Sequence, residues 1–191
     1  MHDDLPPPNK TTGETRLPGD PSVAEAIARI VRVDQAGEYG AKRIYEGQLA
    51  VLGKTPAGDT IRHMADQEAA HLRDFDAVLN ARRVRPTALQ PLWHLAGFAL
   101  GAGTALMGER AAMACTVAVE EAIDEHYAAQ AAYLGEDEKD LRDLIVAARA
   151  DEIDHRDTAI DAGAERAALY EPMRRAIKSG TKLAIWLSER V

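Results

Sequence analysis

Apolar residues recur at spacings of three, four and seven along most of the chain after about residue 22, the period of amphipathic helices. This pattern predicts helices over 22–52, 56–83, 109–134 and 137–162, and a last helix that Pro172 opens. Between them, 89–107 forms an apolar, glycine-rich segment. No stretch alternates apolar and polar residues as a half-buried strand does, so we predict an all-α fold.

Ionisable residues interrupt the apolar faces of the four long helices. Six of them stand where an amphipathic helix should place an apolar side chain: Glu38, Glu68, His71, Glu120, Glu152 and His155. Glu121 is a rival to Glu120, but the face that carries Glu121 has a weaker apolar stripe. We therefore select Glu120 as the residue that points inward.

The order of these residues is duplicated along the chain. A lone glutamate, Glu38, precedes Glu68-x-x-His71, and another, Glu120, precedes Glu152-x-x-His155 at a nearly equal distance. Residues three apart share one face of a helix, so each Glu-x-x-His can present both side chains to one site. Four carboxylates and two imidazoles on four helices are typical of a two-metal carboxylate centre in a helical bundle.

Buried charge explains why metal ions are expected. Carboxylates in a core are unfavourable unless they are neutralised, and four of them repel one another. Two divalent cations balance four negative charges. Oxygen-rich ligands with two imidazoles favour iron or manganese over structural zinc, which prefers thiolates.

Residues beside these six are candidates for supporting contacts. Metal-bound imidazoles usually donate their second ring N–H to an acceptor, and we expect Asp151 to reach across to His71. The matching residue in the first half is Gln67, so we expect the two halves to differ. Tyr45 and Tyr127 either hydrogen-bond to the inward carboxylates or are ordinary core aromatics. We place His126 on a solvated face, with an approach to the site as the alternative.

Composition narrows the class of protein. The 191 residues suit one domain at 22–191, preceded by an acidic, proline-rich arm at 1–21 that we expect to be disordered. The net charge of −8 argues against general nucleic-acid binding. The single Cys115 excludes an internal disulfide and is expected in the core. We expect no secretory signal and no apolar segment long enough to span a membrane. This suggests a bacterial protein that lies in the cytoplasm.

Five stretches of the chain extend well beyond the six candidate ligands: VDQAGEYGAKRIYEGQ (33–48), DQEAAHLRDF (66–75), ALGAGTALMGERAAMACTVAVEEAIDEHY (99–127), ADEIDHRDTAID (150–161) and the ending AIWLSERV. Together they resemble the demethoxyubiquinone hydroxylases of ubiquinone biosynthesis. The resemblance covers about 25–191. It implies a ferritin-like four-helix bundle with two iron ions held by the same six residues, and hydroxylation of a polyprenyl demethoxyubiquinol ring by O2. It also implies NADH as a possible reductant.

A polyprenylated substrate implies contact with a bilayer. We expect a peripheral enzyme on the cytoplasmic side of the bacterial cell membrane, with the apolar 92–107 segment and the last helix as additional elements for membrane contact. The 92–107 segment could instead be buried in a core or a dimer interface. The last helix combines Met173, Ile177 and Trp186 with Arg174, Arg175, Lys178 and Lys182, but it could also be a packing helix with a solvated basic face.

Other functions remain as alternatives at this point. One is a different ferritin-like di-iron oxidase, for iron storage or peroxide reduction, and another is a metal-free, membrane-binding helical bundle. The expected partners are the polyprenylated quinol and the membrane surface, with no nucleic acid. A homo-oligomer or a lipid-binding accessory protein is a further candidate partner.

Overall fold

The computed structural model describes residues 21–191. These residues form six α-helices and two short 3-10 turns with no strand, which confirms the all-α prediction. The helices are α1 (Val23–Leu52), α2 (Ala57–Ala81), α3 (Gln90–Leu106), α4 (Glu109–Tyr133), α5 (Lys139–Asp161) and α6 (Tyr170–Ser188). The predicted arm at 1–21 lies outside the described residues except for Pro21.

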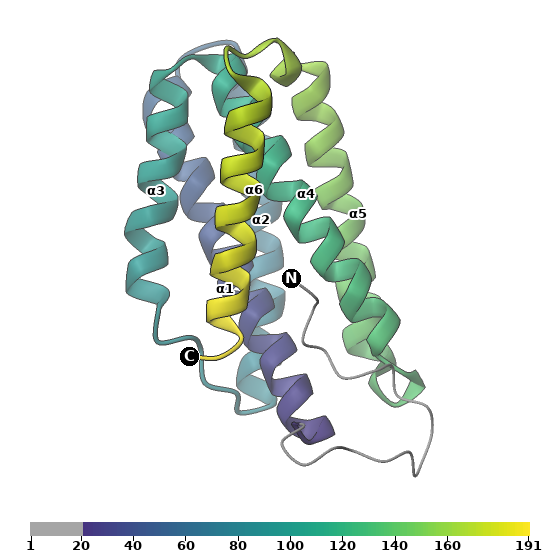
Figure 1. The fold of residues 1–191 in the computed structure, drawn as a ribbon. Coiled ribbons are helices and arrows are strands. Elements are labelled where there is room, and N and C mark those ends of the chain that lie inside the picture. The colour runs from purple at the N-terminus through teal and green to yellow at the C-terminus, as the bar shows by residue number, and fades with distance from the viewer. Residues whose placement is uncertain (1–20) are drawn as a thin grey trace.

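Helices α1, α2, α4 and α5 form a four-helix bundle, and α3 and α6 run along its outside (Figure 1). In the first half of the chain, α1 packs against both α2 and α3. In the second half, α4 packs in the same way against α5 and α6. The duplication seen in the sequence therefore extends to two three-helix units, each a helical hairpin with a third helix on its first member.

Helix ends follow local chemistry. The Ser22 hydroxyl accepts a hydrogen bond from the Glu25 backbone N–H at 3.2 Å, and the Glu25 carboxylate accepts one from the Ser22 N–H at 2.7 Å. This reciprocal pair is the predicted capping box.

After α5, Gly163 has a φ of 91°, a conformation that glycine adopts without a steric penalty. The last helix begins at Tyr170, two residues before the predicted Pro172, which fits inside the first turn because those positions need no N–H donor.

The apolar seams predicted from the sequence face the interior. Val31, Ile61, Phe75 and Met113 are fully buried, and Cys115 lies among them as expected. The six ionisable residues occupy the middle of the same seams and are buried as well. The bundle thus has an apolar core at both ends and a polar layer at its centre.

Outside the bundle, glycines allow α3 to lie directly on α1. A Cβ atom added at Gly101 would lie 1.9 Å from the carbonyl oxygen of Ile44, and one at Gly47 would lie 2.2 Å from that of Phe98. These distances leave no room for a side chain, so the two backbones are in contact. Larger apolar residues of α3 consequently point away from the bundle.

Three of the basic side chains of α6 pair with carboxylates of α4, whereas Arg175 is exposed and pairs with Glu171 of its own helix. Arg174 and Lys178 form ion pairs with Glu121 at 2.7 and 2.9 Å, and Lys178 and Lys182 pair with Glu125 at 2.8 and 2.5 Å. Helix α6 thus packs on α4, as one of the two readings from the sequence expected, but three of its basic residues are paired with α4 carboxylates and not solvated. Within the described residues, no helix combines the length and apolar character needed to cross a bilayer.

The contact between α1 and α3 can be tested by adding one methyl group. We expect Gly101→Ala to lower the free energy of unfolding by about 1–3 kcal/mol, since the new Cβ overlaps the Ile44 carbonyl. Gly103→Ala is the matched control, because no atom lies within 4 Å of its added Cβ. It should raise stability by about 0.5–1 kcal/mol through helix propensity. Urea unfolding measures both, and equal effects of the two variants would contradict the close contact.

Candidate metal centre

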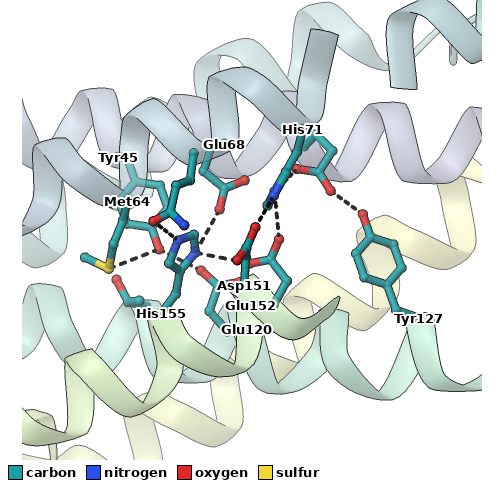
Figure 2. Close-up of polar contacts among 12 residues, drawn as sticks. Tyr45, Met64, Glu68, His71, Glu120, Tyr127, Asp151, Glu152 and His155 are labelled. Carbon is teal, nitrogen blue, oxygen red and sulfur yellow. Dashed lines mark hydrogen bonds and ion pairs between the residues drawn. The ribbon is translucent and has the colours of Figure 1, made fainter. Parts of the chain in front are cut away.

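Six side chains from four helices converge in the middle of the bundle (Figure 2). α1 supplies Glu38, α4 supplies Glu120, and the two Glu-x-x-His pairs come from α2 and α5. Their potential ligand atoms form two overlapping groups, within each of which all the atoms lie within 4.8 Å of one another. One group is Glu38, Glu68, His71 and Glu152, and the other is Glu68, Glu120, Glu152 and His155. Glu68 and Glu152 belong to both groups.

The two imidazoles direct the same ring nitrogen inward. His71 Nδ1 lies 3.5 Å from Glu38 Oε2 and 3.5 Å from Glu152 Oε1. His155 Nδ1 lies 3.2 Å from Glu68 Oε1 and 3.4 Å from Glu152 Oε2. Each imidazole therefore faces two carboxylates, and Glu152 presents one oxygen to each of them.

The outer ring nitrogens are held by residues from the opposite half of the chain. His71 Nε2 donates to Asp151 Oδ2 at 2.9 Å, which is the expected contact. His155 Nε2 donates to the amide oxygen of Gln67 at 3.1 Å, a contact that sequence analysis missed. Gln67 precedes Glu68 as Asp151 precedes Glu152, so the repeat itself contained the signal. A proton fixed on Nε2 leaves the Nδ1 lone pair free to bind a cation.

Two tyrosines at matching positions of the repeat hold the lone glutamates across the bundle. Tyr45 donates to Glu120 Oε1 at 2.8 Å, and Tyr127 donates to Glu38 Oε1. Both tyrosines are buried, so these hydroxyls orient carboxylates rather than contact water. Of the two interpretations of Tyr45 and Tyr127, the structure supports hydrogen bonding to the inward carboxylates.

The inward-facing atoms fit divalent cations. Among the buried polar atoms without a hydrogen-bond partner are Glu38 Oε2, Glu120 Oε2, both carboxylate oxygens of Glu68 and of Glu152, and Nδ1 of His71 and His155. Buried polar atoms normally have partners, so eight unpartnered ones in a single cluster require an explanation. Every one of these atoms is an oxygen or nitrogen that can bind a metal ion, and the set matches the preferences of iron and manganese.

Burial controls protonation of these residues in the absence of a cation. Burial raises the pKa of Glu68 and Glu120 well above the ordinary glutamate value, and the negative charge of Glu152 raises both further. Burial also acts to raise the pKa of Glu152, but the facing imidazoles of His155 and His71 outweigh it and lower that pKa to about 2. Burial acts to lower the pKa of His71, whereas Glu152 and Glu38 raise it to about 11. Without a cation the cluster therefore holds protons that metal ligands must lose.

Other residues are placed differently from the sequence expectations. Glu120 is buried in the cluster, whereas Glu121 points toward α6 and its basic residues. His126 was expected on a solvated face, but it is only 8% exposed. It lies against a second polar cluster in which Gln130 donates to Asp34 at 2.7 Å. Apolar periodicity missed this arrangement because the partners come from different helices.

An apolar cavity of about 410 Å³ lies on the outer side of α1 and α4, under α3 and α6. Gly37 and Val119, the sequence neighbours of Glu38 and Glu120, are among its lining residues. The cavity therefore borders the two helices that supply the lone glutamates. Most of its remaining lining consists of glycine, alanine and aliphatic side chains, so it suits an apolar ligand.

Comparison with known proteins identifies what the chain is similar to. The profile of a family described as ubiquinone biosynthesis protein COQ7 matches residues 25–188. A 3-demethoxyubiquinol 3-hydroxylase from Rhodospirillum rubrum is 58% identical over 183 residues, which cover 95% of this chain and 86% of that protein. The mitochondrial NADPH-dependent 3-demethoxyubiquinone 3-hydroxylase of Mus musculus is 53% identical, over 86% of this chain and 78% of that protein. The mitochondrial 5-demethoxyubiquinone hydroxylase of Saccharomyces cerevisiae is 41% identical over 88% of this chain and 79% of that protein.

The raised pKa values of Glu68, Glu120 and His71 predict that divalent metal binding releases protons at neutral pH. Apparent affinity for Mn(II) should therefore rise with pH between about 6 and 8, by about tenfold per pH unit for each proton released. Calorimetry in two buffers of different ionisation enthalpy counts these protons. An affinity independent of pH would show that the inward groups have already lost these protons in the metal-free protein.

Proposed function

The chain belongs to the COQ7 family of ubiquinone biosynthesis proteins, and we propose that its central cluster holds two iron ions with which it hydroxylates the ring of a polyprenyl demethoxyubiquinol, using O2. The relatives in this family are named as hydroxylases of demethoxyubiquinol or demethoxyubiquinone. The single observation that carries the proposal is the pair of overlapping carboxylate and imidazole groups, all of whose members are buried.

Each iron would have its own glutamate and histidine. Glu38 and His71 would hold one ion, Glu120 and His155 the other, and Glu68 and Glu152 both, because these two carboxylates belong to both groups. Bound iron supplies the redox chemistry that makes O2 reactive toward an electron-rich quinol ring. The chain supplies the fixed positions of the ligands and a site without bulk water.

Four supporting residues keep the ligands in place. The hydroxyls of Tyr45 and Tyr127 each fix one oxygen of a lone glutamate, leaving the other oxygen unpartnered. Asp151 and Gln67 hold the protons on the outer nitrogens of the two imidazoles. Ligands oriented in advance need not reorganise when an ion binds, which favours a defined geometry over nonspecific binding.

The apolar cavity under α3 and α6 is the site that we propose for the quinol. Its small lining residues, such as Gly37, Gly40 and Ala184, leave space beside the bundle for a planar ring or a prenyl chain. It is bounded by the backbone segments that carry Glu38 and Glu120. A ligand held there would lie next to the helices of the metal centre while its tail stays in an apolar environment.

The alternative functions are less well supported. A metal-free bundle leaves the eight unpartnered atoms at the centre without an explanation. An iron-storage protein or a peroxidase has no need of an apolar cavity beside the metal centre. The hydroxylase accounts for both features and agrees with the names of the relatives.

For the electron donor we propose a reduced nicotinamide in solution. The sequence resemblance suggested NADH, whereas the printed name of the mouse relative specifies NADPH. The described residues contain no strand, so they do not form the strand–turn–helix unit of a dinucleotide-binding fold. Anaerobic reduction of the iron-loaded protein by each nucleotide distinguishes the two donors.

We also propose that the protein binds a membrane surface through the outward face of α3. Leu95, Leu106 and Met107 are 69%, 76% and 63% exposed, and Leu183 and Trp186 of α6 are also exposed. Large exposed apolar side chains such as these are candidates for an interaction site. Both helices also line the apolar cavity, so a ligand could pass between the bilayer and the cavity. The 58% identity to a bacterial protein fits a bacterial cell membrane as the location.

The proposed reaction can be tested by loading the protein with Fe(II) without oxygen and adding a demethoxyubiquinol analogue, a reductant and labelled O2. We expect mass spectrometry to show a quinol with one added, labelled oxygen atom. Rapid iron oxidation with unchanged quinol would instead support the storage or peroxidase function.

We expect the variant Glu120→Ala to fold and to lose more than about 100-fold in hydroxylation rate, since removing a metal ligand reduces activity more than removing its outer partners does. The exposed Glu109 of the same helix provides the control variant Glu109→Ala, which should retain activity.

Filling the cavity should separate quinol binding from metal binding. No atom lies within 4 Å of a Cβ added at Gly40, which lines the cavity, or at Gly103, which is exposed and does not line it. We expect Gly40→Phe to raise the KM for the quinol by at least about tenfold, an effect of roughly 1.4 kcal/mol, while iron content stays unchanged. Gly103→Phe should leave both unchanged. An unchanged KM in Gly40→Phe would show that the substrate lies elsewhere.

Membrane contact by α3 is tested by introducing charge on its outward face. Leu95→Glu should weaken co-sedimentation with phospholipid vesicles, because a carboxylate is unfavourable in an apolar interface. Val146 of α5 is 50% exposed, so Val146→Glu provides the matched control and should bind as the unmodified protein does. Equal vesicle binding by both variants and the unmodified protein would remove α3 from the interface.

A further inference from the structure

The two halves of the metal centre differ at positions that the repeat makes equivalent. Asp151 accepts the hydrogen bond from His71 at 2.9 Å, whereas Gln67 accepts the one from His155 at 3.1 Å. The Asp151 side chain is 45% exposed to solvent, whereas Gln67 carries an amide that cannot ionise. One imidazole thus has a carboxylate acceptor and the other an amide acceptor.

A second matched pair differs in the same direction. Asp34 lies one helical turn before Glu38 and accepts a hydrogen bond from Gln130 at 2.7 Å. The corresponding residue one turn before Glu120 is Thr116, which accepts a hydrogen bond from Gln48 at 3.4 Å. Both groups are buried. The half that contains Glu38 therefore has an acidic residue where the half that contains Glu120 has a hydroxyl.

Of these two differences, the one between Asp151 and Gln67 has the larger expected effect on the metal ligands. Burial raises the pKa of the Asp34 carboxyl well above its ordinary value, which disfavours its charged form. Asp151 is partly solvated and accepts a hydrogen bond directly from His71. An anionic acceptor draws the Nε2 proton of an imidazole more strongly than an amide does, and this makes the inward nitrogen a better electron donor.

We propose that the two metal positions are inequivalent, and that the position at Glu38 and His71 binds its divalent ion first and more tightly than the position at Glu120 and His155. The inference rests on the proposed two-metal function, and it concerns the order in which the positions fill. The shared ligands Glu68 and Glu152 contribute to both positions, so they do not produce the difference. The outer acceptors Asp151 and Gln67 act as positioning residues that set it.

Titration with Zn(II) alone tests this without any turnover. Calorimetry should resolve two binding events whose affinities differ by at least about tenfold, the range expected for outer partners of metal-bound histidines. Nitrogen NMR of ring-labelled histidine should show His71 changing during the first equivalent and His155 during the second. The variants His71→Gln and His155→Gln assign the two signals.

Isosteric variants exchange the two acceptors. Asp151→Asn should weaken the first event by about tenfold and bring the two affinities together, and Gln67→Glu should strengthen the event at His155. The double variant should reverse the order in which the histidine signals change. Asp154→Asn is the control, because Asp154 is an exposed acid on the same helix and has no hydrogen bond or ion pair among the described residues.

The outcomes separate this inference from the function on which it rests. Two ions that bind with equal affinity, or a first ion that changes His155, would overturn the inequivalence and leave the two-metal centre intact. Failure to bind two ions would overturn the metal centre itself. If Asp151→Asn lowers stability, thermal unfolding will reveal it, and Gln67→Glu then tests the same claim from the other half.

Discussion

Mutual repulsion among four buried carboxylates is the constraint around which this molecule is built. Glu38, Glu68, Glu120 and Glu152 lie at the centre of the bundle, where burial alone disfavours their charged forms. Two imidazoles cannot neutralise them and also present free nitrogen lone pairs inward. Two divalent cations would satisfy both conditions, because they would balance the charge and bind the unpartnered oxygen and nitrogen atoms.

The rest of the fold positions this cluster and places an apolar cavity beside the helices that carry it. Each half of the chain supports the ligands of the other: Tyr45 holds Glu120, and Asp151 holds His71. Such cross-contacts link the two helical hairpins through their polar layer as well as through their apolar ends. Outside the bundle, α3 and α6 enclose the apolar cavity, with α3 held by backbone contact and α6 by ion pairs to α4. A metal centre in a polar layer and a cavity for an apolar ligand therefore lie on opposite sides of the same two helices.

Spacing along single helices could be read from the sequence, and contacts between helices largely could not. The inward direction of Glu120 followed from its apolar seam, and the structure places it in the cluster. The repeat pointed to Gln67 as the counterpart of Asp151, but its hydrogen bond with His155 was missed because that contact joins α2 and α5. His126 looked solvated since the position of Asp34 depends on how α1 packs against α4. The ion pairs of Arg174, Lys178 and Lys182 could not be read from the sequence for the same reason, because their partners belong to α4.

Anomalous diffraction at the iron absorption edge, on crystals of the iron-loaded protein, tests the central claim most directly. The account predicts two iron peaks between α1, α2, α4 and α5, each beside one of the two imidazole Nδ1 atoms and both in contact with Glu68 and Glu152. A single peak, or iron bound only at surface carboxylates, would contradict it, since four buried carboxylates would then have to be neutralised by protons alone.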